Sequence, residues 1–151
     1  IANTVKQFWS DVIWSDVDFM FIDMPPGTGD VALTVMQEIP MEGVIIVSTP
    51  QDMVSMIVKK VVIMAEELKV NILGVVENMS YVKCGKCGEK VRLFSENSAK
   101  EQADYLGLEL LAEMPINSDL VKNMEAKKAE EYISNSLEYN DLLNNFIKKL
   151  K

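Results

Sequence analysis

Two cysteines, Cys84 and Cys87, are the residues whose type and spacing point most directly to chemistry. They are the only cysteines in the chain, and the segment "VKCGKCGEK" (82–90) holds both. Thiolates at this spacing can chelate a metal, but a zinc ion or an iron–sulfur cluster takes four protein ligands. The sequence has no histidine and no third cysteine, so we expect a second copy, related by a two-fold axis, to complete the site. The sequence therefore predicts a homodimer that joins through a metal loop at about residues 79–92.

The residues around the two thiols favour metal binding. Lys83, Lys86 and Lys90 are expected to lower the thiol pKa and so to increase the thiolate fraction. The loop by itself leaves several functions open, namely a zinc knuckle, an iron–sulfur cluster, a redox dithiol or an inert turn. The redox dithiol is the weakest of these, because thioredoxin-type pairs open a helix, whereas the strand-like run "KVRLF" (90–94) follows here.

Asp23 is a second candidate, since it ends the apolar run "VDFMFID" (17–23). In open α/β sheets, ligands bind beyond the carboxyl ends of the strands, and a carboxylate at that place suits Mg²⁺. The following "MPPGTGD" (24–30) has two prolines that fix φ, beside Gly27 and Gly29, which can take φ > 0. This combination is typical of a loop with two arrangements, although a simple turn after a buried strand has the same composition.

The whole composition excludes several classes of function. The chain has 151 residues, of which 48% are hydrophobic and 25% charged, as in an ordinary globular protein. Without histidine it has no Ser-His-Asp or Cys-His catalytic set. A net charge of −8 and a pI of about 4.6 argue against non-specific binding to nucleic acid or a membrane surface. Two cysteines in one short loop form no disulfide framework, and no apolar run approaches the roughly 20 residues of a membrane helix, so we expect a cytoplasmic protein.

Apolar runs and helical periodicities alternate along the chain, and this alternation predicts the elements that position these residues. The predicted strands cover residues 17–23, 42–50, 71–79 and 108–115. The predicted helices cover about 30–38, 52–69, 97–106, 118–131 and 137–150. Continuous apolar runs are typical of strands buried on both faces, so we expect a three-layer α/β fold with a mostly parallel sheet, in one domain over residues 1–151. A helical pattern is already under way at Ile1, so we also expect the sequence to be a fragment of a longer one.

Five segments, taken in order, carry a resemblance to a known family. They are "DFMFIDMPPGTGD" (18–30), "VIIVSTPQD" (44–52), "GVVENMS" (74–80), "VKCGKCGEK" (82–90) and "LLAEMPINSDL" (110–120). Together they resemble the Mrp family of P-loop ATPases, which are cytoplasmic iron–sulfur cluster carriers related to MinD and ParA. The resemblance extends to about residue 120 and implies a MinD-type, P-loop NTPase-like fold.

The resemblance also implies a role for individual residues in nucleotide binding. Asp23 would hold the water shell of Mg²⁺, and Gly27 would sense the γ-phosphate. Asn78 would face the edge of adenine, which an amide can both donate to and accept from. Pro115 or its neighbours would lie beside the base. The cofactors implied for the full-length protein are thus ATP and Mg²⁺.

For Cys84 and Cys87 the resemblance implies a labile 4Fe–4S cluster that bridges two subunits. The implied function is a nucleotide-regulated carrier that transfers this cluster to apo iron–sulfur proteins. Zinc fits a set of four thiolates as well, so a zinc-bound form stays open. Two rival functions also stay open: a MinD- or ParA-type positioning ATPase, and a structural domain held together by zinc.

The sequence departs from the family at one decisive point. The family has a Gly-rich loop with lysine near the N-terminus that binds the phosphates, and no Gly-Lys-Ser or Gly-Lys-Thr occurs in this sequence. We therefore expect a fold without the N-terminal strand and the P-loop. Since positioning and electrostatics account for nearly all of phosphoryl-transfer catalysis, we expect these residues alone neither to bind ATP tightly nor to hydrolyse it.

Overall fold

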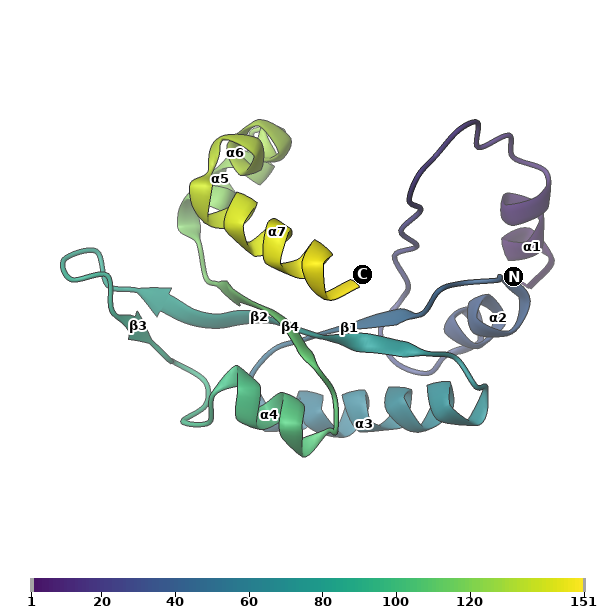
Figure 1. Cartoon of the computed structure of the whole chain (residues 1–151), viewed down its shortest axis with the longest axis horizontal. Coiled ribbons are helices and arrows are strands. Elements are labelled where there is room, and N and C mark those ends of the chain that lie inside the picture. Colours follow the sequence, from purple (N-terminus) through teal and green to yellow (C-terminus); the bar gives the residue numbers. More distant parts are fainter. Residues whose placement is uncertain (1, 151) are drawn as a thin grey trace. The chain divides into compact units, whose positions relative to one another are not determined.

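The computed structural model describes the backbone of residues 2–150 and the side chains of residues 3–51 and 56–149, so Ile1 lies outside the description. The helices are α1 (Ala2–Ser10), α2 (Asp30–Glu38), α3 (Asp52–Glu67), α4 (Ala99–Tyr105), α5 (Ser118–Glu125), α6 (Ala129–Asn135) and α7 (Leu137–Leu150). The strands are β1 (Val44–Ser48), β2 (Ile72–Lys83), β3 (Lys90–Val91) and β4 (Leu110–Pro115) (Figure 1). None of the described helices is both long enough and apolar enough to cross a membrane.

The chain divides into two compact units. The N-terminal unit comprises Ile1–Val44 and Met56–Ile72, and the sheet unit comprises Ile45–Ser55 and Leu73–Lys151. The first holds Asp23 and Gly27, and the second holds both cysteines. The prediction of one domain over the whole chain stays a prediction.

Strand β2 is the centre of the sheet unit, because it pairs with each of the other three strands. Its partner β4 runs parallel to it, with Val75 opposite Leu110 and Tyr81 opposite Pro115. The short strand β3 pairs with the far end of β2 in the antiparallel direction. Helices α4 and α7 both contact β4 and lie on opposite sides of the sheet (Figure 1). The predicted three-layer α/β class is therefore confirmed.

Gly74 allows β2 and β4 to approach each other closely. It is buried and has φ +148°, a conformation that side chains rarely adopt. A Cβ at this position would lie 2.5 Å from the carbonyl oxygen of Glu109 and 2.7 Å from Cγ of Leu111. Glycine is thus required both by the backbone conformation and by the packing of the core residue Leu111, which is 3% exposed.

In the N-terminal unit, helix α2 is amphipathic and contacts α1. Its buried residues recur at helical spacing, and they are Ala32, Val35, Met36 and Ile39 just after its end. Helix α3 has a matching buried stripe, formed by Val58, Val62 and Ala65. Both helices were predicted from this periodicity, and both are confirmed.

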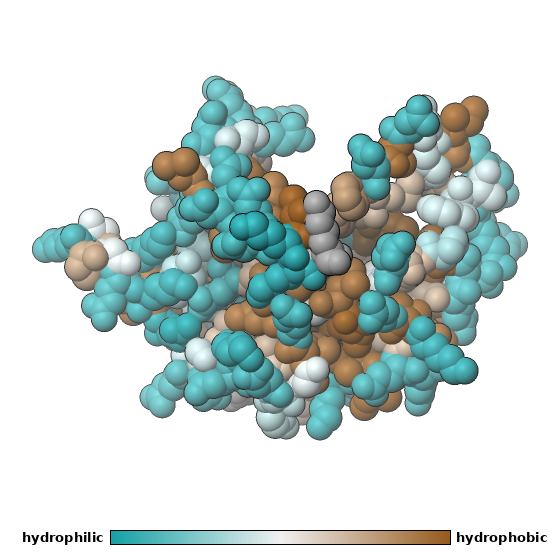
Figure 2. Space-filling view, viewed as in Figure 1, coloured by the Kyte–Doolittle hydropathy of each residue, from teal (hydrophilic) through white to brown (hydrophobic). Residues whose placement is uncertain are grey.

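The predicted first strand, residues 17–23, is wrong. This segment has no regular secondary structure, and Phe19 and Phe21 are 77% and 72% exposed. A strand requires a neighbour whose N–H and C=O groups pair with its own, and no strand among the described residues pairs with this segment. Apolar residues also reach the surface elsewhere, as the brown areas in Figure 2 show.

Other boundaries differ from the prediction in smaller ways. The helix predicted over 118–131 is interrupted between α5 and α6, where Lys127 has φ 57° and so cannot continue a right-handed helix. Strand β2 extends beyond residue 79 to Lys83, because its far end pairs with β3. The other three predicted strands are confirmed as β1, β2 and β4.

Candidate functional site

The two cysteines lie together in the loop that joins β2 and β3. The base of this loop is closed by the strand pairs Val82–Val91 and Lys83–Lys90. Inside it, the N–H of Cys84 donates to the carbonyl of Glu89 at 2.9 Å, and the N–H of Gly88 donates to the carbonyl of Cys84 at 2.8 Å. Both cysteines are free thiols, with Cys84 half-buried and Cys87 exposed. We call residues 82–91 the cysteine hairpin.

The loop backbone favours the thiolate form of Cys84. The N–H of Cys87, and after it the N–H of Lys86 and the Cys87 thiol, lower the pKa of the Cys84 thiol by bonding to its sulfur. The sequence attributed this effect to the charges of nearby lysines, and that cause is wrong. Lys83 is paired with Glu138 at 2.6 Å and Lys90 with Glu113 at 2.7 Å, so these charges are directed to carboxylates.

The candidate metal ligands in the cysteine hairpin are the two thiols. In the part of the chain that the structure describes, no three His, Cys, Asp or Glu side chains come together where they could hold a metal ion. A pair of thiolates fits half of the four-thiolate set that zinc and iron–sulfur clusters use. The donor set therefore fits such a group only when further ligands come from outside this chain.

Asn78 and Pro115, the residues predicted to contact adenine, lie on the neighbouring strands β2 and β4 of the sheet unit. The register between these strands shifts between Glu77 and Tyr81, and Met79 has φ 57°, so β2 bulges beside Asn78. The Asn78 Oδ1 accepts the N–H of Met79 at 2.9 Å. This bond orients the amide, so that its nitrogen can donate to a ligand. The adenine contact itself stays a prediction.

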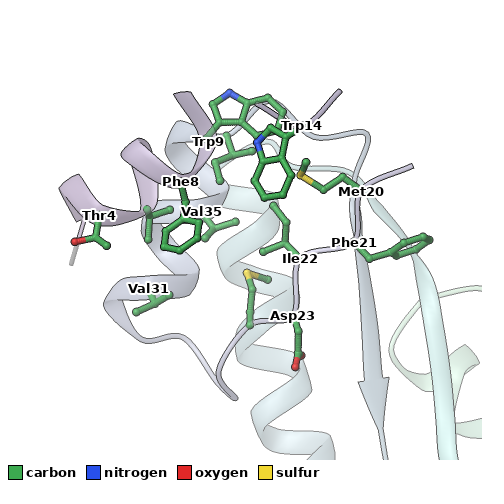
Figure 3. A pocket seen from close by; sticks show the side chains of 13 residues that line it. Thr4, Phe8, Trp9, Trp14, Met20, Phe21, Ile22, Asp23, Val31 and Val35 are labelled. Carbon is green, nitrogen blue, oxygen red and sulfur yellow. The ribbon is translucent and has the colours of Figure 1, made fainter. Parts of the chain in front are cut away.

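Asp23 and Gly27 lie in the N-terminal unit, on the irregular segment before α2. Gly27 has φ +86° and open space around its Cα, which suits a mobile backbone turn. The exposed Asp23 lies at the edge of an apolar cavity of about 590 Å³. Figure 3 shows Trp9 and Trp14 at one end of this cavity and the Asp23 carboxylate at the other. Their roles toward Mg²⁺ and phosphate stay predictions.

Sequence reasoning missed a cluster of polar residues inside the sheet unit. Ser80 and Glu77 are 1% and 4% exposed. The Ser80 hydroxyl lies 2.6 Å from Glu77 Oε1 and 2.8 Å from Glu113 Oε1. Lys90 Nζ donates to Glu113 Oε2 and Arg92 donates to Glu113 Oε1, each at 2.7 Å. The signal was a lone acid in each of two otherwise apolar strand runs, "GVVENM" (74–79) and "LLAEMP" (110–115).

The two acids of this cluster differ in their pKa. Burial raises the pKa of Glu77, as does the charge of Glu113, against the opposing effects of the Ser80 hydrogen bond and Arg92. Burial also acts to raise the pKa of Glu113, but hydrogen bonds from Lys90 and Ser80 and the charges of Lys90 and Arg92 hold it below its usual range. Of the two acids, Glu77 therefore holds its proton to higher pH, and Glu113 more strongly favours the charged form.

Comparison with protein families gives one match over the whole chain. A family model described as NUBPL iron-transfer P-loop NTPase, within ParA, matches residues 1–151.

Several curated relatives are named iron–sulfur cluster carrier protein. The relative from Clostridium perfringens is 53% identical over 134 residues, which cover 89% of this chain and 47% of the relative. The one from Methanocaldococcus jannaschii is 42% identical, covering 78% of this chain and 41% of the relative. The one from Escherichia coli K12 is 37% identical, covering 82% and 34%. The chain thus spans less than half the length of these relatives.

A solved structure from Archaeoglobus fulgidus, described as a nucleotide-binding protein in complex with ADP with cobalt found, is similar in fold. It superposes with a TM-score of 0.75 and 45% sequence identity, covering 87% of this chain and 54% of that one. The family match and this superposition together confirm the predicted P-loop NTPase-like fold.

Proposed function

Since this chain belongs to the ParA/NUBPL family of iron-transfer P-loop NTPases, we propose that it binds an iron–sulfur cluster through Cys84 and Cys87 and delivers it to apo-proteins. The observation that supports this most is the cysteine hairpin. It holds two free thiols in one loop that its own hydrogen bonds close, and the described residues offer no third ligand near them.

The cluster is a 4Fe–4S cluster shared between two copies of the chain. Two hairpins that meet on a two-fold axis provide four thiolates, the number that such a cluster takes. Each copy holds its cargo by only two bonds, and Cys87 is exposed. A cluster held in this way is labile, as a carrier requires.

Nucleotide regulates this carrier. Asp23 holds the water shell of Mg²⁺ and Gly27 senses the γ-phosphate, while Asn78 and Pro115 contact the base. The exposure of Asp23 and the open space at Gly27 are compatible with these roles. No Gly-Lys-Ser or Gly-Lys-Thr occurs in the sequence, so the residues described here are expected to be inactive in ATP hydrolysis on their own.

The carrier works as one P-loop NTPase-like domain in the cytoplasm, where thiols stay reduced. Its net charge of −8 disfavours attraction to nucleic acid or anionic lipid. This charge also weighs against the MinD- or ParA-type positioning function.

Anaerobic reconstitution with iron and sulfide tests the proposal. Wild type is expected to gain a visible absorption band and to bind iron and sulfide in equal amounts, whereas the Cys84→Ser/Cys87→Ser double variant stays colourless. Lys86→Ser is the matched control, since it changes the same loop and keeps the N–H that bonds to Cys84. Equal lack of colour in wild type and in the double variant would refute the carrier function. Tightly bound zinc that iron and sulfide do not displace would instead support a structural zinc site.

A further inference from the structure

Strand pairing alone fixes the cysteine hairpin weakly. Strand β3 has only two residues, and it pairs with β2 through Val82–Val91 and Lys83–Lys90. An isolated two-stranded hairpin is marginal in water even when it is longer. Something further must therefore hold the loop that carries the thiols in one orientation.

Glu113 provides this hold from strand β4. Its Oε2 accepts from Lys90 Nζ and its Oε1 from Arg92, each at 2.7 Å. The Glu113 side chain is only 17% exposed, so solvent screens these pairs less than it screens ordinary surface ion pairs. The Lys90 ammonium also lies 4.1 Å from the centre of the Tyr81 ring. Lys90 in β3 and Arg92 just after it are thus both bound to one carboxylate, on strand β4.

The Ser80 hydroxyl lies between the two acids, 2.6 Å from Glu77 Oε1 and 2.8 Å from Glu113 Oε1. Of the two acids, it is Glu113 that also accepts from Lys90 and Arg92. These bonds hold the pKa of Glu113 below its usual range, whereas burial raises the pKa of Glu77. The acid that favours the charged form is thus the one that faces the two cations.

A short covalent path leads from this anchor to the metal ligands. Lys90 follows Glu89, whose carbonyl accepts the N–H of Cys84 at 2.9 Å. The ion pair between Glu113 and Lys90 therefore fixes the position of the neighbouring Glu89 carbonyl. This carbonyl accepts the hydrogen bond from Cys84 and so positions that residue. Resting on the proposed function, we propose that Glu113 is a positioning residue, which orients the cysteine hairpin so that two copies can share one cluster.

The test compares Glu113→Gln with the matched control Glu109→Gln. Gln keeps the size of the side chain and removes the charge. Glu109 lies just before the other end of β4, where its carboxylate is 3.9 Å from Lys149 and far along the strand from β3. Cluster loss to an added iron chelator is expected to be about tenfold faster in Glu113→Gln, as for other supporting groups around metal ligands, and unchanged in Glu109→Gln.

Amide hydrogen exchange of the cluster-free chain gives a second, independent readout. In Glu113→Gln, the N–H groups of Cys84 and Gly88 are expected to exchange faster, while those of Val75 and Leu111 keep the wild-type rate. Faster exchange across the whole sheet would show a general loss of stability and overturn the proposal. If wild type takes up no cluster, the proposed function fails, and the exchange of these two amides alone decides the role of Glu113.

Variants of Lys90 separate positioning from folding. Lys90→Arg keeps the charge and is expected to behave as wild type. Lys90→Met is expected to change both readouts in the same direction as Glu113→Gln but by a smaller amount, because Arg92 still pairs with Glu113. The double variant should be no worse than Glu113→Gln alone, because Lys90 acts through Glu113. Lys90 is about half exposed, so its variants fold even if Glu113→Gln does not. Additive effects in the double variant would overturn the proposal.

Discussion

The segment before Asp23 and the cysteine hairpin are both short stretches for which the sequence predicts chemistry, but they differ in what holds them in place. Residues 17–23 form no strand, and their aromatic side chains are largely exposed. The hairpin closes its loop with backbone hydrogen bonds and is bound to β4 through Glu113. The hairpin is therefore held by contacts that the structure shows, whereas no described strand pairs with the Asp23 segment.

This difference teaches that an apolar run in the sequence predicts buried residues but does not identify the strand or helix that covers them. The residues of 17–23 have the composition of a buried parallel strand, yet a strand forms only beside a partner. The hairpin has a polar and turn-forming composition, yet the hydrogen bonds that close its loop lie within about ten residues of one another. Only its orientation depends on a distant residue, Glu113.

Metal removal gives the largest expected effect. If two copies share one cluster as proposed, a chelator should dissociate that dimer fully into single chains, while the far-ultraviolet circular dichroism stays unchanged because the hairpin closes through its own bonds. Analytical ultracentrifugation with and without chelator measures this. Unfolding on chelation would mean that the metal holds the fold together, as structural zinc does by roughly 10 kcal/mol, and the comparison of the two segments would fail.

Gly74→Ala tests the close approach of β2 and β4. The added Cβ would lie 2.5 Å from the Glu109 carbonyl, at φ +148°, so we expect the free energy of unfolding to fall by about 2–4 kcal/mol. Urea denaturation measures the loss. Gly85→Ala is the control, because nothing lies within 4 Å of the added atom there, and a similar loss in both variants would contradict the explanation.

The pH dependence of stability in Glu77→Gln tests the role of Glu77 in the buried cluster. Because burial raises the pKa of Glu77 in the folded state, its contribution to stability is fully present below the ordinary value and is lost as pH rises through the folded value. Gln resembles the protonated acid at every pH. Relative to wild type, the variant should therefore gain stability as pH rises above the ordinary carboxyl pKa, and a difference that is constant with pH would rule out this role.

Phe19→Ser gives the smallest expected effect. The side chain is 77% exposed, so its loss should change the free energy of unfolding by less than about 0.5 kcal/mol. Leu111→Ala, at a site 3% exposed, is the contrasting change and should cost about 3 kcal/mol. A large loss on replacing Phe19 would show that the segment is covered in solution, and the contrast with the hairpin would weaken.

The sequence was sufficient for those features that depend on local pattern. Periodicity predicted α2 and α3, and apolar runs predicted β1, β2 and β4. The cysteine loop was visible from its composition. The run "KVRLF" (90–94), which contains β3, was recognised as strand-like, but its pairing with β2 was not predicted.

What the sequence did not show depends on contacts between distant positions. Glu113 lies 23 residues from Lys90 and 21 from Arg92, and only the pairing of β2 with β4 and β3 brings them together. Likewise, the lysines around the thiols gave the right direction for the Cys84 pKa but the wrong cause, since the bonds that lower it come from backbone N–H groups whose orientation depends on the turn.

The two thiols of the hairpin are unequal, since Cys84 is half-buried and accepts backbone N–H groups, whereas Cys87 is exposed. On the proposed function, an acceptor's thiol meets the iron on the Cys87 side first. The bond to Cys87 is then exchanged early and the bond to Cys84 last. In this proposal, the cluster would be transferred by stepwise exchange of its thiolate ligands and would not be released into water.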